Sequence, residues 1–392
     1  MGGNRMRRSC IIIMITALAA MILAGLCQPE PALAAPATTS KYVCLLDSAS
    51  GQVLYGRNMD EKRQVASTTK MMTAILAVEY AGLNETAVVS QHADKTLEYT
   101  IGLRAGATLT VEELLKAALL RSANDAAVVL AEHVAGDEML FAHLMSVKAF
   151  AIGAVHTRYE NASGLPGNKQ HSTAYDQAVI GRYLMTDPVL KPLVGSKQGY
   201  FKHPDYREAL LLNNTNTLLS SYAGADGIKT GTTNAAGKCL VASATRQERQ
   251  LIAVALNSYD RSGDCKRLLD YGFNHTGPVL VVDKAEPFKE LALEGGRENS
   301  VPVYPDRDIY LWLGDSQLNV EKRVLLNYDI KAPVAKNQNL GTLKVYVEGK
   351  PMAEANLRTE AEYRQRPGWA VRMLNGLARR WGIFPGSVEN DP

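Results

Sequence analysis

Hydrophobic positions recur along the chain in two ways. Between residues 41 and 275, short apolar runs typical of strands flank a long middle part in which apolar residues recur at helical spacing. Strands are expected at 42–46, 53–55, 239–245 and 251–257, and helices at 70–80, 110–120, 125–134, 138–152, 174–185 and 261–273. Helices inserted between an N-terminal hairpin and C-terminal strands predict one α/β domain. Its mostly antiparallel sheet would be built from both ends of the segment.

The pattern loses its helical period after Pro278. Short β-like runs with turn signals follow at 279–282, 301–304, 309–313, 323–328 and 341–348, and they predict a small all-β domain. In the tail, from Pro367 to Phe384, apolar residues including Trp369 and Trp381 return to helical spacing with arginines among them. This pattern is typical of an amphipathic helix that lies in the plane of a membrane surface. The alternative is a helix docked on the protein itself.

The first residues carry a targeting pattern. A cluster of arginines precedes the apolar run 11–26, and Ala32 and Ala34 supply the small residues of a cleavage site. We therefore expect a signal peptide that is cleaved after Ala34, with an uncleaved membrane anchor as the alternative. The predicted organisation is a signal peptide at 1–34, the α/β domain at 35–277, the all-β domain at 278–362 and the amphipathic membrane-anchor tail at 363–392.

Composition and charge narrow the class of protein. The chain has 392 residues, of which 46% are hydrophobic and 21% charged, so it is long enough for two domains with a sizeable core. The formal net charge of +3 is too small to indicate nucleic acid as the partner.

Cysteines and histidines show no pattern of a metal site. Cleavage after Ala34 would leave Cys44, Cys239 and Cys265, an odd number that cannot pair completely in an exported chain. Cys44 and Cys239 lie in apolar strand-like runs, which favours buried thiols, while a bridge between Cys239 and Cys265 stays open. The chain has no C-x-x-C or H-E-x-x-H motif, and its seven histidines show no metal-ligand spacing. Neither a metal nor a cofactor is expected.

Ser67 and Lys70 are the first candidates for chemistry. Ser67 shortly precedes a run of good helix formers, so it lies at the start of a helix, near unpaired backbone N–H groups. A spacing of three places both side chains on one face, with Cβ atoms about 5–6 Å apart. A neutral lysine can then remove the serine proton and create a nucleophile. For this pair alone, an N-cap serine followed by a surface lysine is the alternative.

Two further segments follow Ser67 and Lys70 along the chain, and the order of the three favours a catalytic site. Ser122-Ala123-Asn124 lies in a short connection between two predicted helices, where side chains can project into a cleft. Lys229-Thr230-Gly231 leads from a turn into a strand. Each segment alone has a structural explanation, as a helix end with its neighbour's cap or as an edge strand before a turn. All three together predict one shared site.

The three segments resemble a known set of motifs. Ser67-Thr68-Thr69-Lys70, Ser122-Ala123-Asn124 and Lys229-Thr230-Gly231 together resemble those of serine penicillin-binding proteins and class A β-lactamases. The residues around them narrow the resemblance to low-molecular-mass D-alanyl-D-alanine carboxypeptidases. Ile330 to Val334 and Gly341 to Leu343 resemble the C-terminal β domain of that family, and the basic tail resembles its membrane anchor. The resemblance covers nearly all of the chain after the predicted signal peptide.

The resemblance implies a penicillin-binding-protein or β-lactamase-like fold and a role for each motif residue. Ser67 attacks the carbonyl between two terminal D-alanines and becomes an acyl-ester. Lys70 accepts its proton, and Ser122 relays a proton toward the leaving amine. Asn124 orients Lys70 and the substrate amide, Lys229 and Thr230 bind the terminal carboxylate, and the backbone N–H groups of Ser67 and Thr232 form the oxyanion hole. The substrate-binding residues implied are Asn124, Lys229, Thr230, Gly231 and Thr232.

The implied protein is an exported serine D-alanyl-D-alanine carboxypeptidase, a hydrolase of cell-wall synthesis. Its partners would be peptidoglycan stem peptides ending in D-Ala-D-Ala, β-lactams as covalent inhibitors, and the outer face of the cytoplasmic membrane through the tail helix. A D,D-endopeptidase using the same site is one alternative, and an inactive cell-wall-binding protein of this fold is another. A class A-like β-lactamase is a third: Glu160 lies in the right part of the chain for it, but without the Glu-x-x-Leu-Asn spacing.

The chemistry requires Lys70 to be largely neutral. Its pKa must fall from about 10.4 toward roughly 7–8, which corresponds to about 4 kcal/mol. A helix N-terminus contributes about 0.3–1 kcal/mol, or up to ~2 when the group is partly buried. An ammonium about 5 Å away contributes on the order of 3 kcal/mol at an effective dielectric constant of about 20. We therefore expect the charge of Lys229 to lower this pKa most, with burial adding the rest.

Overall fold

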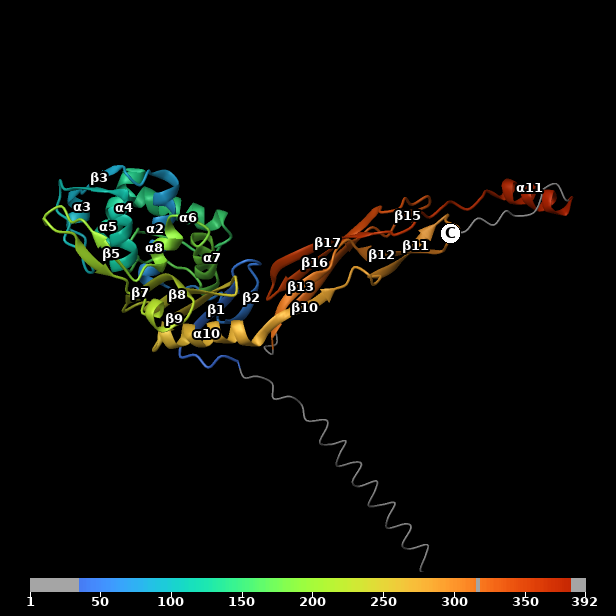
Figure 1. The fold of residues 1–392 in the computed structure, drawn as a ribbon. Helices are drawn as coiled ribbons and strands as arrows, with labels where there is room; N and C mark the ends of the chain where they lie inside the picture. The colour runs from blue at the N-terminus through green and yellow to red at the C-terminus, as the bar shows by residue number, and fades with distance from the viewer. Residues whose placement is uncertain (1–34, 315–317, 382–392) are drawn as a thin grey trace, which may run out of the picture.

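A five-stranded sheet organises the N-terminal part of the computed structural model, which describes residues 35–314 and 318–381 (Figure 1). The strand order is β2-β1-β9-β8-β7, and every neighbouring pair is antiparallel. The strands are β1 Tyr42–Asp47, β2 Val53–Arg57, β7 Ala225–Thr233, β8 Gly237–Arg246 and β9 Arg249–Ser258. Because β1 pairs with β9, both ends of the segment contribute to one sheet, and the predicted α/β class is confirmed.

Both faces of this sheet are buried, which explains the continuous apolar runs in its strands. In β1, Val43 and Leu45 belong to the core on one face, whereas Cys44 and Leu46 belong to the larger core on the other. The covering helices are α10 (Arg261–His275) on the first face, and α2 (Lys70–Tyr80) with α7 (Ala174–Leu184) on the second.

The long middle part of the domain is mainly helical, as expected. It contains α3 Gln91–Asp94, α4 Val111–Lys116, the π-helical turn η2 Ala117–Arg121, α5 Asn124–Ala135, α6 Glu138–Ala151, α8 Leu190–Gly195 and α9 Leu218–Ser221. It also contains two short antiparallel ribbons that the pattern does not predict, β3 (Thr86–Val88) with β4 (Thr108–Thr110) and β5 (Gln198–Phe201) with β6 (Leu210–Asn213).

The helix expected at 110–120 begins with a cap and changes its form before it ends. Thr110 Oγ1 accepts from the backbone N–H of Glu113 at 3.2 Å. The Glu113 carboxylate accepts from Lys116 Nζ and from the backbone N–H of Lys202. The chain then continues from α4 into the wider π-helical turn η2, which ends immediately before Ser122.

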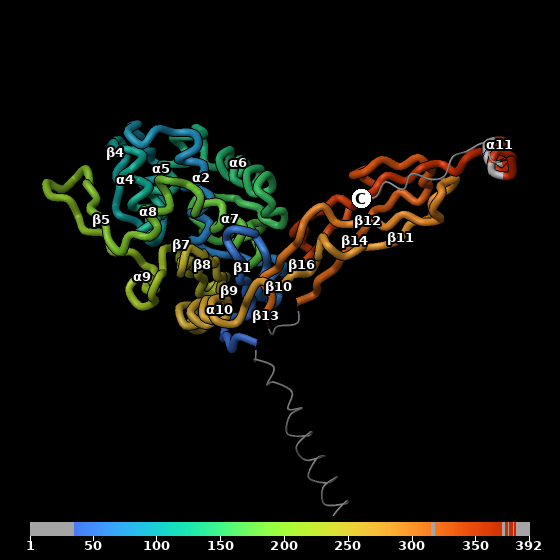
Figure 2. Tube along the Cα trace, turned by 45° about the vertical axis from the view of Figure 1, so that its right-hand side comes forward, coloured from blue at the N-terminus to red at the C-terminus, as the bar shows by residue number. Residues whose placement is uncertain are grey.

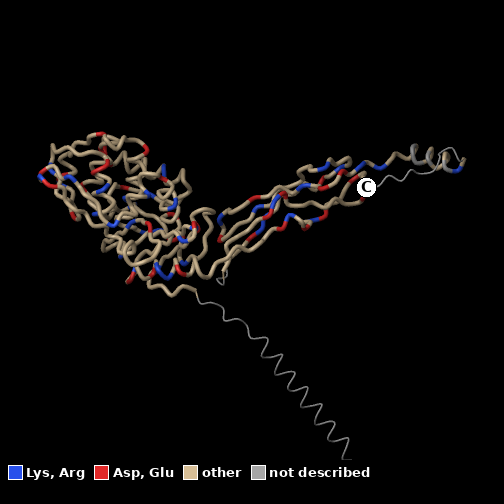
Figure 3. Tube along the Cα trace, viewed as in Figure 1, with Lys and Arg blue, Asp and Glu red and all other residues tan. Residues whose placement is uncertain are grey.

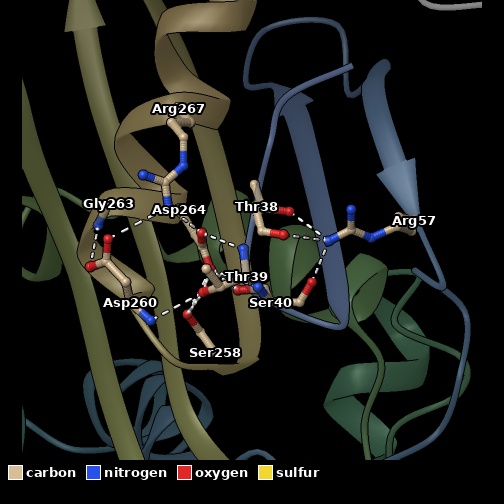
Figure 4. A network of polar contacts seen from close by, with 9 residues as sticks. All are labelled: Thr38, Thr39, Ser40, Arg57, Ser258, Asp260, Gly263, Asp264 and Arg267. Carbon is tan, nitrogen blue, oxygen red and sulfur yellow. Dashed lines mark hydrogen bonds and ion pairs between the residues drawn. The ribbon is translucent and has the colours of Figure 1, made fainter. Parts of the chain in front are cut away.

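The start of α10 is tied to the first described residues through Asp264 (Figure 4). Its buried carboxylate accepts from Thr39, Ser40, Ser258 and Arg267 at 2.5–2.9 Å. These hydrogen bonds hold the pKa of Asp264 below its usual range, although burial alone would raise it. The network therefore fixes the segment that precedes β1 against the helix that covers the sheet.

The cysteines of the described residues form no disulfide. Cys44, Cys239 and Cys265 are free and buried, so the expected buried thiols are observed and the bridge left open between Cys239 and Cys265 is absent. Burial raises the pKa of each thiol.

A second, all-β part follows α10 directly. β10 (Thr276–Val282) pairs with β13 (Ile309–Gly314), and a six-stranded sheet has the order β14-β16-β17-β12-β11-β15. Its strands are β11 Lys289–Glu294, β12 Ser300–Pro305, β14 Val320–Leu326, β15 Ile330–Lys331, β16 Asn339–Val347 and β17 Lys350–Arg358. This part has a core of its own. Figure 3 shows acidic and basic residues interspersed along both parts.

The β part adjoins the α/β domain where β10 and β13 lie beside α10 (Figure 2). At this junction β13 contacts β2 through a few polar and aromatic groups. Gln52 Nε2 donates to Trp312 O at 2.6 Å, and Trp312 N donates to Gln52 Oε1 at 2.8 Å. The Arg249 guanidinium lies 3.6 Å from the centroid of the Trp312 ring. Lys350 Nζ contacts Asp60 Oδ1 at 2.9 Å.

The last described element is α11 (Trp369–Arg380), at the end of the β part farthest from the α/β domain (Figure 1). Helix formation in the tail was predicted; the predicted signal peptide and the end of the tail lie outside the described residues. Among the residues that the structure describes, no helix is both long and apolar enough to span a bilayer.

Candidate active site

Ser67 and Lys70 lie on one short helical stretch. Ser67 belongs to a 3-10 turn, Ala66–Thr69, and Lys70 is the first residue of α2. The Lys70 amine lies 3.1 Å from Ser67 Oγ. A proton can therefore pass directly from the hydroxyl to the amine.

Lys70 is fully buried and has three oxygen partners. Besides Ser67 Oγ, its amine contacts Asn124 Oδ1 at 2.6 Å and the Ser163 carbonyl at 2.7 Å. A neutral amine has two N–H groups and one lone pair. Asn124 Oδ1 and the Ser163 carbonyl can only accept, so they take the two N–H groups. The lone pair then faces the Ser67 hydroxyl, which is the orientation that a general base needs.

Asn124 is oriented by carbonyls of a neighbouring segment. Its Nδ2 donates to Leu97 O at 3.2 Å and to Glu98 O at 3.0 Å, which turns Oδ1 toward Lys70. Both amide hydrogens are used within the chain in this conformation. Asn124 would contact a substrate amide only by giving up one of them.

Ser122 and Lys229 form the second contacting pair. Ser122 follows η2 in a left-handed conformation, with φ of 69°, and leads into α5. Lys229, buried on β7, donates to Ser122 Oγ at 2.9 Å. The hydroxyl is thus supplied with a hydrogen bond from the lysine and keeps its own proton available for another acceptor.

Predicted residues Thr230 and Thr232 are held by residues that the sequence did not single out. Thr230 Oγ1 lies 2.6 Å from Thr215 Oγ1. Arg261 Nη1 donates to Thr232 Oγ1 and to the Gly231 carbonyl, both at 2.9 Å. Arg261 is the first residue of α10, so the helix behind the sheet supplies a cation to the edge of the site.

Gly231 permits β7 to approach the turn that carries Ser67. A Cβ atom at this position would lie 2.9 Å from Ser67 N and 2.9 Å from Val65 O. A side chain would therefore force the strand away from the serine. The two expected oxyanion donors, the N–H groups of Ser67 and Thr232, come from these two adjoining segments.

A cavity of about 210 Å³ lies where these segments meet. It is lined by Ser67, Tyr99, Arg121, Ser122, Thr215, Thr230, Gly231, Thr232 and Arg261. Lys70, Asn124 and Lys229 contact lining residues from beneath. A larger cavity of about 680 Å³ over the outer side of α6 is lined by Glu160 but by none of the residues of the three motifs. Tyr99, Arg121, Thr215 and Arg261 are the lining residues that sequence reasoning missed.

The two lysines have strongly lowered pKa values. Burial lowers the pKa of Lys70 well below its usual 10.5; the charge of Lys229 lowers it further and Asp125 opposes both. Burial also lowers the pKa of Lys229 to about 7, with a contribution from Arg261. We expected the charge of Lys229 to be the main cause of the lowered pKa of Lys70. This expectation was wrong, because burial lowers that pKa more. Both side chains are almost fully enclosed, and this enclosure makes desolvation the first cause.

Glu160 is engaged within its own loop. Its Oε2 accepts from the backbone N–H groups of Lys169 and Gln170 at 2.9 and 3.2 Å. The group of this loop that reaches Lys70 is the Ser163 carbonyl instead. The arrangement thus differs from one in which a loop glutamate activates the deacylating water, as the β-lactamase alternative requires.

Comparison with known families divides the chain in two. A family model described as D-alanyl-D-alanine carboxypeptidase matches residues 30–260. A model of the C-terminal domain of penicillin-binding protein 5 matches residues 278–365. The first match includes every motif residue of the cavity, and the second covers the strands of the β part.

Curated relatives cover most of the chain. D-alanyl-D-alanine carboxypeptidase DacF of Bacillus subtilis is 29% identical over 336 residues, which is 83% of this chain and 86% of the relative. D-alanyl-D-alanine carboxypeptidase DacC of Escherichia coli is 30% identical over 344 residues, covering 84% of this chain and 85% of the relative.

Solved structures agree with the fold of both parts. The D-alanyl-D-alanine carboxypeptidase DacD of Francisella tularensis matches with a TM-score of 0.68 at 25% identity, covering 88% of this chain and 98% of the other. Penicillin-binding protein 5 of Haemophilus influenzae matches with a TM-score of 0.63 at 27% identity, covering 85% of this chain and all of the other.

Proposed function

The chain belongs to the D-alanyl-D-alanine carboxypeptidase family and is a serine-type penicillin-binding carboxypeptidase, and on this premise we propose that Ser67 is its nucleophile and Lys70 its general base. The observation that carries the proposal is the set of contacts around Lys70. Two acceptors fix its N–H groups, and the third partner is the hydroxyl to be activated. The lowered pKa of Lys70 keeps the amine neutral enough to take that proton.

In the acylation step, Ser67 Oγ attacks the carbonyl carbon of the penultimate D-alanine and its proton passes to Lys70. Negative charge develops on the carbonyl oxygen, toward the N–H groups of Ser67 and Thr232. The C–N bond then breaks, and Ser122 gives its proton to the leaving nitrogen. Lys229, which contacts Ser122 Oγ, restores that proton. Proton exchange between the two lysines resets the pair before water hydrolyses the ester.

Substrate recognition uses the cationic end of the cavity. Lys229, Arg261 and the Thr230 hydroxyl lie together at the β7 edge, and a terminal carboxylate fits this group by charge and by hydrogen bonding. A bound carboxylate favours the protonated form of Lys229, whose pKa burial lowers to about 7. Binding of the correct substrate would thus add positive charge beside Lys70 and favour its neutral form.

A covalent label tests the nucleophile directly. Intact-protein and peptide mass spectrometry after exposure to benzylpenicillin should show one adduct, on Ser67. Ser67→Ala should abolish the adduct with the fold intact. An adduct on another serine, or labelling of Ser67→Ala at the normal rate, would remove Ser67 as the nucleophile. Rapid turnover of penicillin without a lasting adduct would favour the β-lactamase alternative.

We also propose that the protein acts outside the cytoplasmic membrane and lies against its outer surface through α11. The predicted signal peptide, 1–34, supports export. On α11, Trp369, Met373 and Leu374 are 74%, 56% and 62% exposed, so the described part of the chain does not cover this apolar side. An in-plane helix would bury it among lipid headgroups. In this proposal the predicted β domain at 278–362 holds the catalytic domain at 35–277 away from the surface.

Truncation tests this placement. A chain ending at Pro367 keeps the hydrogen bond from Arg366 N to Gly295 O but lacks α11. It should no longer sediment with vesicles of phosphatidylglycerol and phosphatidylethanolamine, and its peptidase activity should be unchanged. Equal sedimentation of the full and truncated chains would contradict the anchor.

A further inference from the structure

Glu138 connects two segments that converge on Lys70, although it lies outside the catalytic cavity. It is the first residue of α6, and its side chain is 15% exposed. One carboxylate oxygen, Oε1, accepts from the backbone N–H of Ala162 at 2.9 Å. The other, Oε2, lies 2.8 Å from His92 Nε2. Each of these contacts leads to one of the two acceptors that orient the lysine amine.

The first connection runs through the segment Ala162–Ser163. Ala162 is held at both of its backbone groups, because its N–H donates to Glu138 and its carbonyl accepts from Thr73 Oγ1 at 2.6 Å. The next carbonyl, that of Ser163, accepts from Lys70 at 2.7 Å. Fixing Ala162 therefore aims the following peptide group at the amine.

The second connection runs through α3. His92 lies on this short helix, and the chain continues from it to Leu97 and Glu98. The carbonyls of Leu97 and Glu98 bind Asn124 Nδ2, which turns Asn124 Oδ1 toward Lys70. Glu138 thus joins the segment 162–163, which supplies one acceptor of Lys70, to the segment 92–98, which orients the other acceptor.

We propose that Glu138 is a positioning residue for the reaction: its carboxylate clamps the segments 92–98 and 162–163 together so that both acceptors of Lys70 keep the amine lone pair on Ser67. This rests on the proposed role of Lys70 as the base. The effect should fall on the chemical step, because Glu138 contacts none of the residues that line the cavity. Binding of the substrate carboxylate at Lys229 and Arg261 should be unaffected.

The charges around His92 favour its protonated form, which strengthens its contact with Glu138. Glu138, Glu132 and Asp137 face the imidazole, and the hydrogen bond to Glu138 is the main cause that raises its pKa, while partial burial opposes the rise. The contact between Glu138 and Ala162 does not depend on this protonation. Loss of His92 should therefore weaken the clamp less than loss of Glu138.

A second glutamate in the chain provides a matched control. Glu85 Oε1 accepts from the backbone N–H of Gly82 at 2.8 Å, and its Oε2 lies 3.0 Å from His133 Nε2. Glu85 has the same types of hydrogen-bond partner as Glu138, although its side chain is 55% exposed and that of Glu138 is 15% exposed. Neither Gly82 nor His133 contacts Lys70 or its acceptors. Variants of Glu85 and His133 thus report the general cost of losing such a pair.

The experiment measures acylation of the full-length mature protein by a chromogenic cephalosporin in stopped flow. Saturation separates the dissociation constant of the non-covalent complex from the acylation rate constant k2. In Glu138→Ala, k2 should fall about tenfold to a hundredfold, the loss expected when a reacting group is misplaced by about 1 Å. The dissociation constant should change less than about twofold, since no binding contact is lost.

Conservative and partial variants sharpen the test. Glu138→Gln should keep k2 within about threefold of the parent, since its amide oxygen can still accept from Ala162. His92→Ala should lower k2 about fivefold, the effect of one net hydrogen bond of about 1 kcal/mol. Glu85→Ala and His133→Ala should leave k2 within about twofold, because this pair contacts neither Lys70 nor its acceptors.

The proposal is overturned if Glu138→Ala keeps the parental k2, if Glu138→Gln is as slow as Glu138→Ala, or if Glu85→Ala slows k2 equally. Titration of active sites normalises each rate to folded enzyme, and His92→Ala with its control His133→Ala decides the question should Glu138→Ala not fold. Lys70→Ala in the same assay separates the two claims. If Lys70→Ala does not acylate while Glu138→Ala is normal, only the positioning role fails; if Lys70→Ala acylates normally, the base itself fails.

Discussion

The α/β domain buries charged side chains, whereas the described part of the β domain buries none. Lys70, Lys229, Asp47, Asp125, Asp176 and Asp264 are all buried in the first. Of the described residues beyond 277, Thr359 is the only buried polar side chain. Burial of a charge costs several kcal/mol unless the group is paired or neutral. The β domain thus has an apolar interior, as expected of the spacer proposed for it, and the α/β domain has an interior that changes the pKa values of its lysines.

The buried charges of the α/β domain fall into two kinds. Asp125 accepts from the backbone N–H groups of Ile101, Gly102 and Leu103, and Asp264 accepts from several hydroxyl and N–H donors. These carboxylates join segments that are distant in the sequence. Among the residues that the structure describes, no carboxylate is bound to Lys70 or Lys229, and burial lowers the pKa of both. A buried carboxylate with several donors therefore marks structure here, and a buried lysine without a carboxylate partner marks the candidate site.

Replacing one lysine in each domain should give the largest contrast. Lys70→Met removes the proposed base and should lower the acylation rate about 10³-fold or more, near the upper range for general base catalysis. Lys350→Met removes the β-domain lysine that contacts Asp60 and should leave the rate unchanged. Both rates are measured with a fluorescent penicillin, and circular dichroism checks the fold. Normal acylation by Lys70→Met would contradict the proposed role of Lys70 and remove the contrast between the two lysines.

Replacing one aspartate in each domain should lower the free energy of unfolding by different amounts. Asp264→Asn should lower the free energy of unfolding by about 3 kcal/mol or more, because Arg267 and the hydroxyl groups lose a buried anion. Asp306→Asn in the β domain should cost less, since its contacts with Asn356 are exposed.

The pH dependence of unfolding tests the direction of the pKa shift of Asp264. The folded pKa of Asp264 is below its ordinary value of 3.8. Its contribution is therefore present above about pH 4 and is lost as the pH falls toward the folded pKa. Thermal unfolding between pH 2 and 7 should show a steep loss for the parent below about pH 4 and a shallower one for Asp264→Asn. Parallel curves would contradict the assignment.

The contact between the domains should have the smallest effect. Trp312→Ala removes the stacking with Arg249 and should lower the free energy of unfolding by about 1–2 kcal/mol. The acylation rate should stay the same, and small-angle X-ray scattering should show a wider spread of domain orientations. A loss of acylation would show that the β domain acts on the cleft.

The spacing of residues along the sequence made part of the site predictable. Ser67 and Lys70 are three residues apart, so helical geometry alone brings them together. Lys229 was assigned through the motif set, and the structure brings it to Ser122. The α/β pattern was equally local, since both faces of one sheet are covered and its strands are continuous apolar runs.

Other parts of the site carry no local signal. The Ser163 carbonyl is a backbone group, which any residue would supply, so no residue type indicates it. Arg261 reaches the cleft from a helix on the far side of the sheet. Strands β11 and β17 were missed because they are rich in charged and polar residues, and their pairing depends on neighbours distant in sequence.

The bare backbone at Gly231 limits how this enzyme can evolve under antibiotic pressure. Any larger residue there would collide with the chain beside Ser67, the proposed nucleophile. Selection therefore cannot vary a side chain at this position of the cleft. Its neighbours Thr232 and Arg261 are joined by one hydrogen bond and are open to substitution without that collision. Adaptive changes in drug sensitivity should therefore accumulate around the glycine and leave the glycine itself invariant.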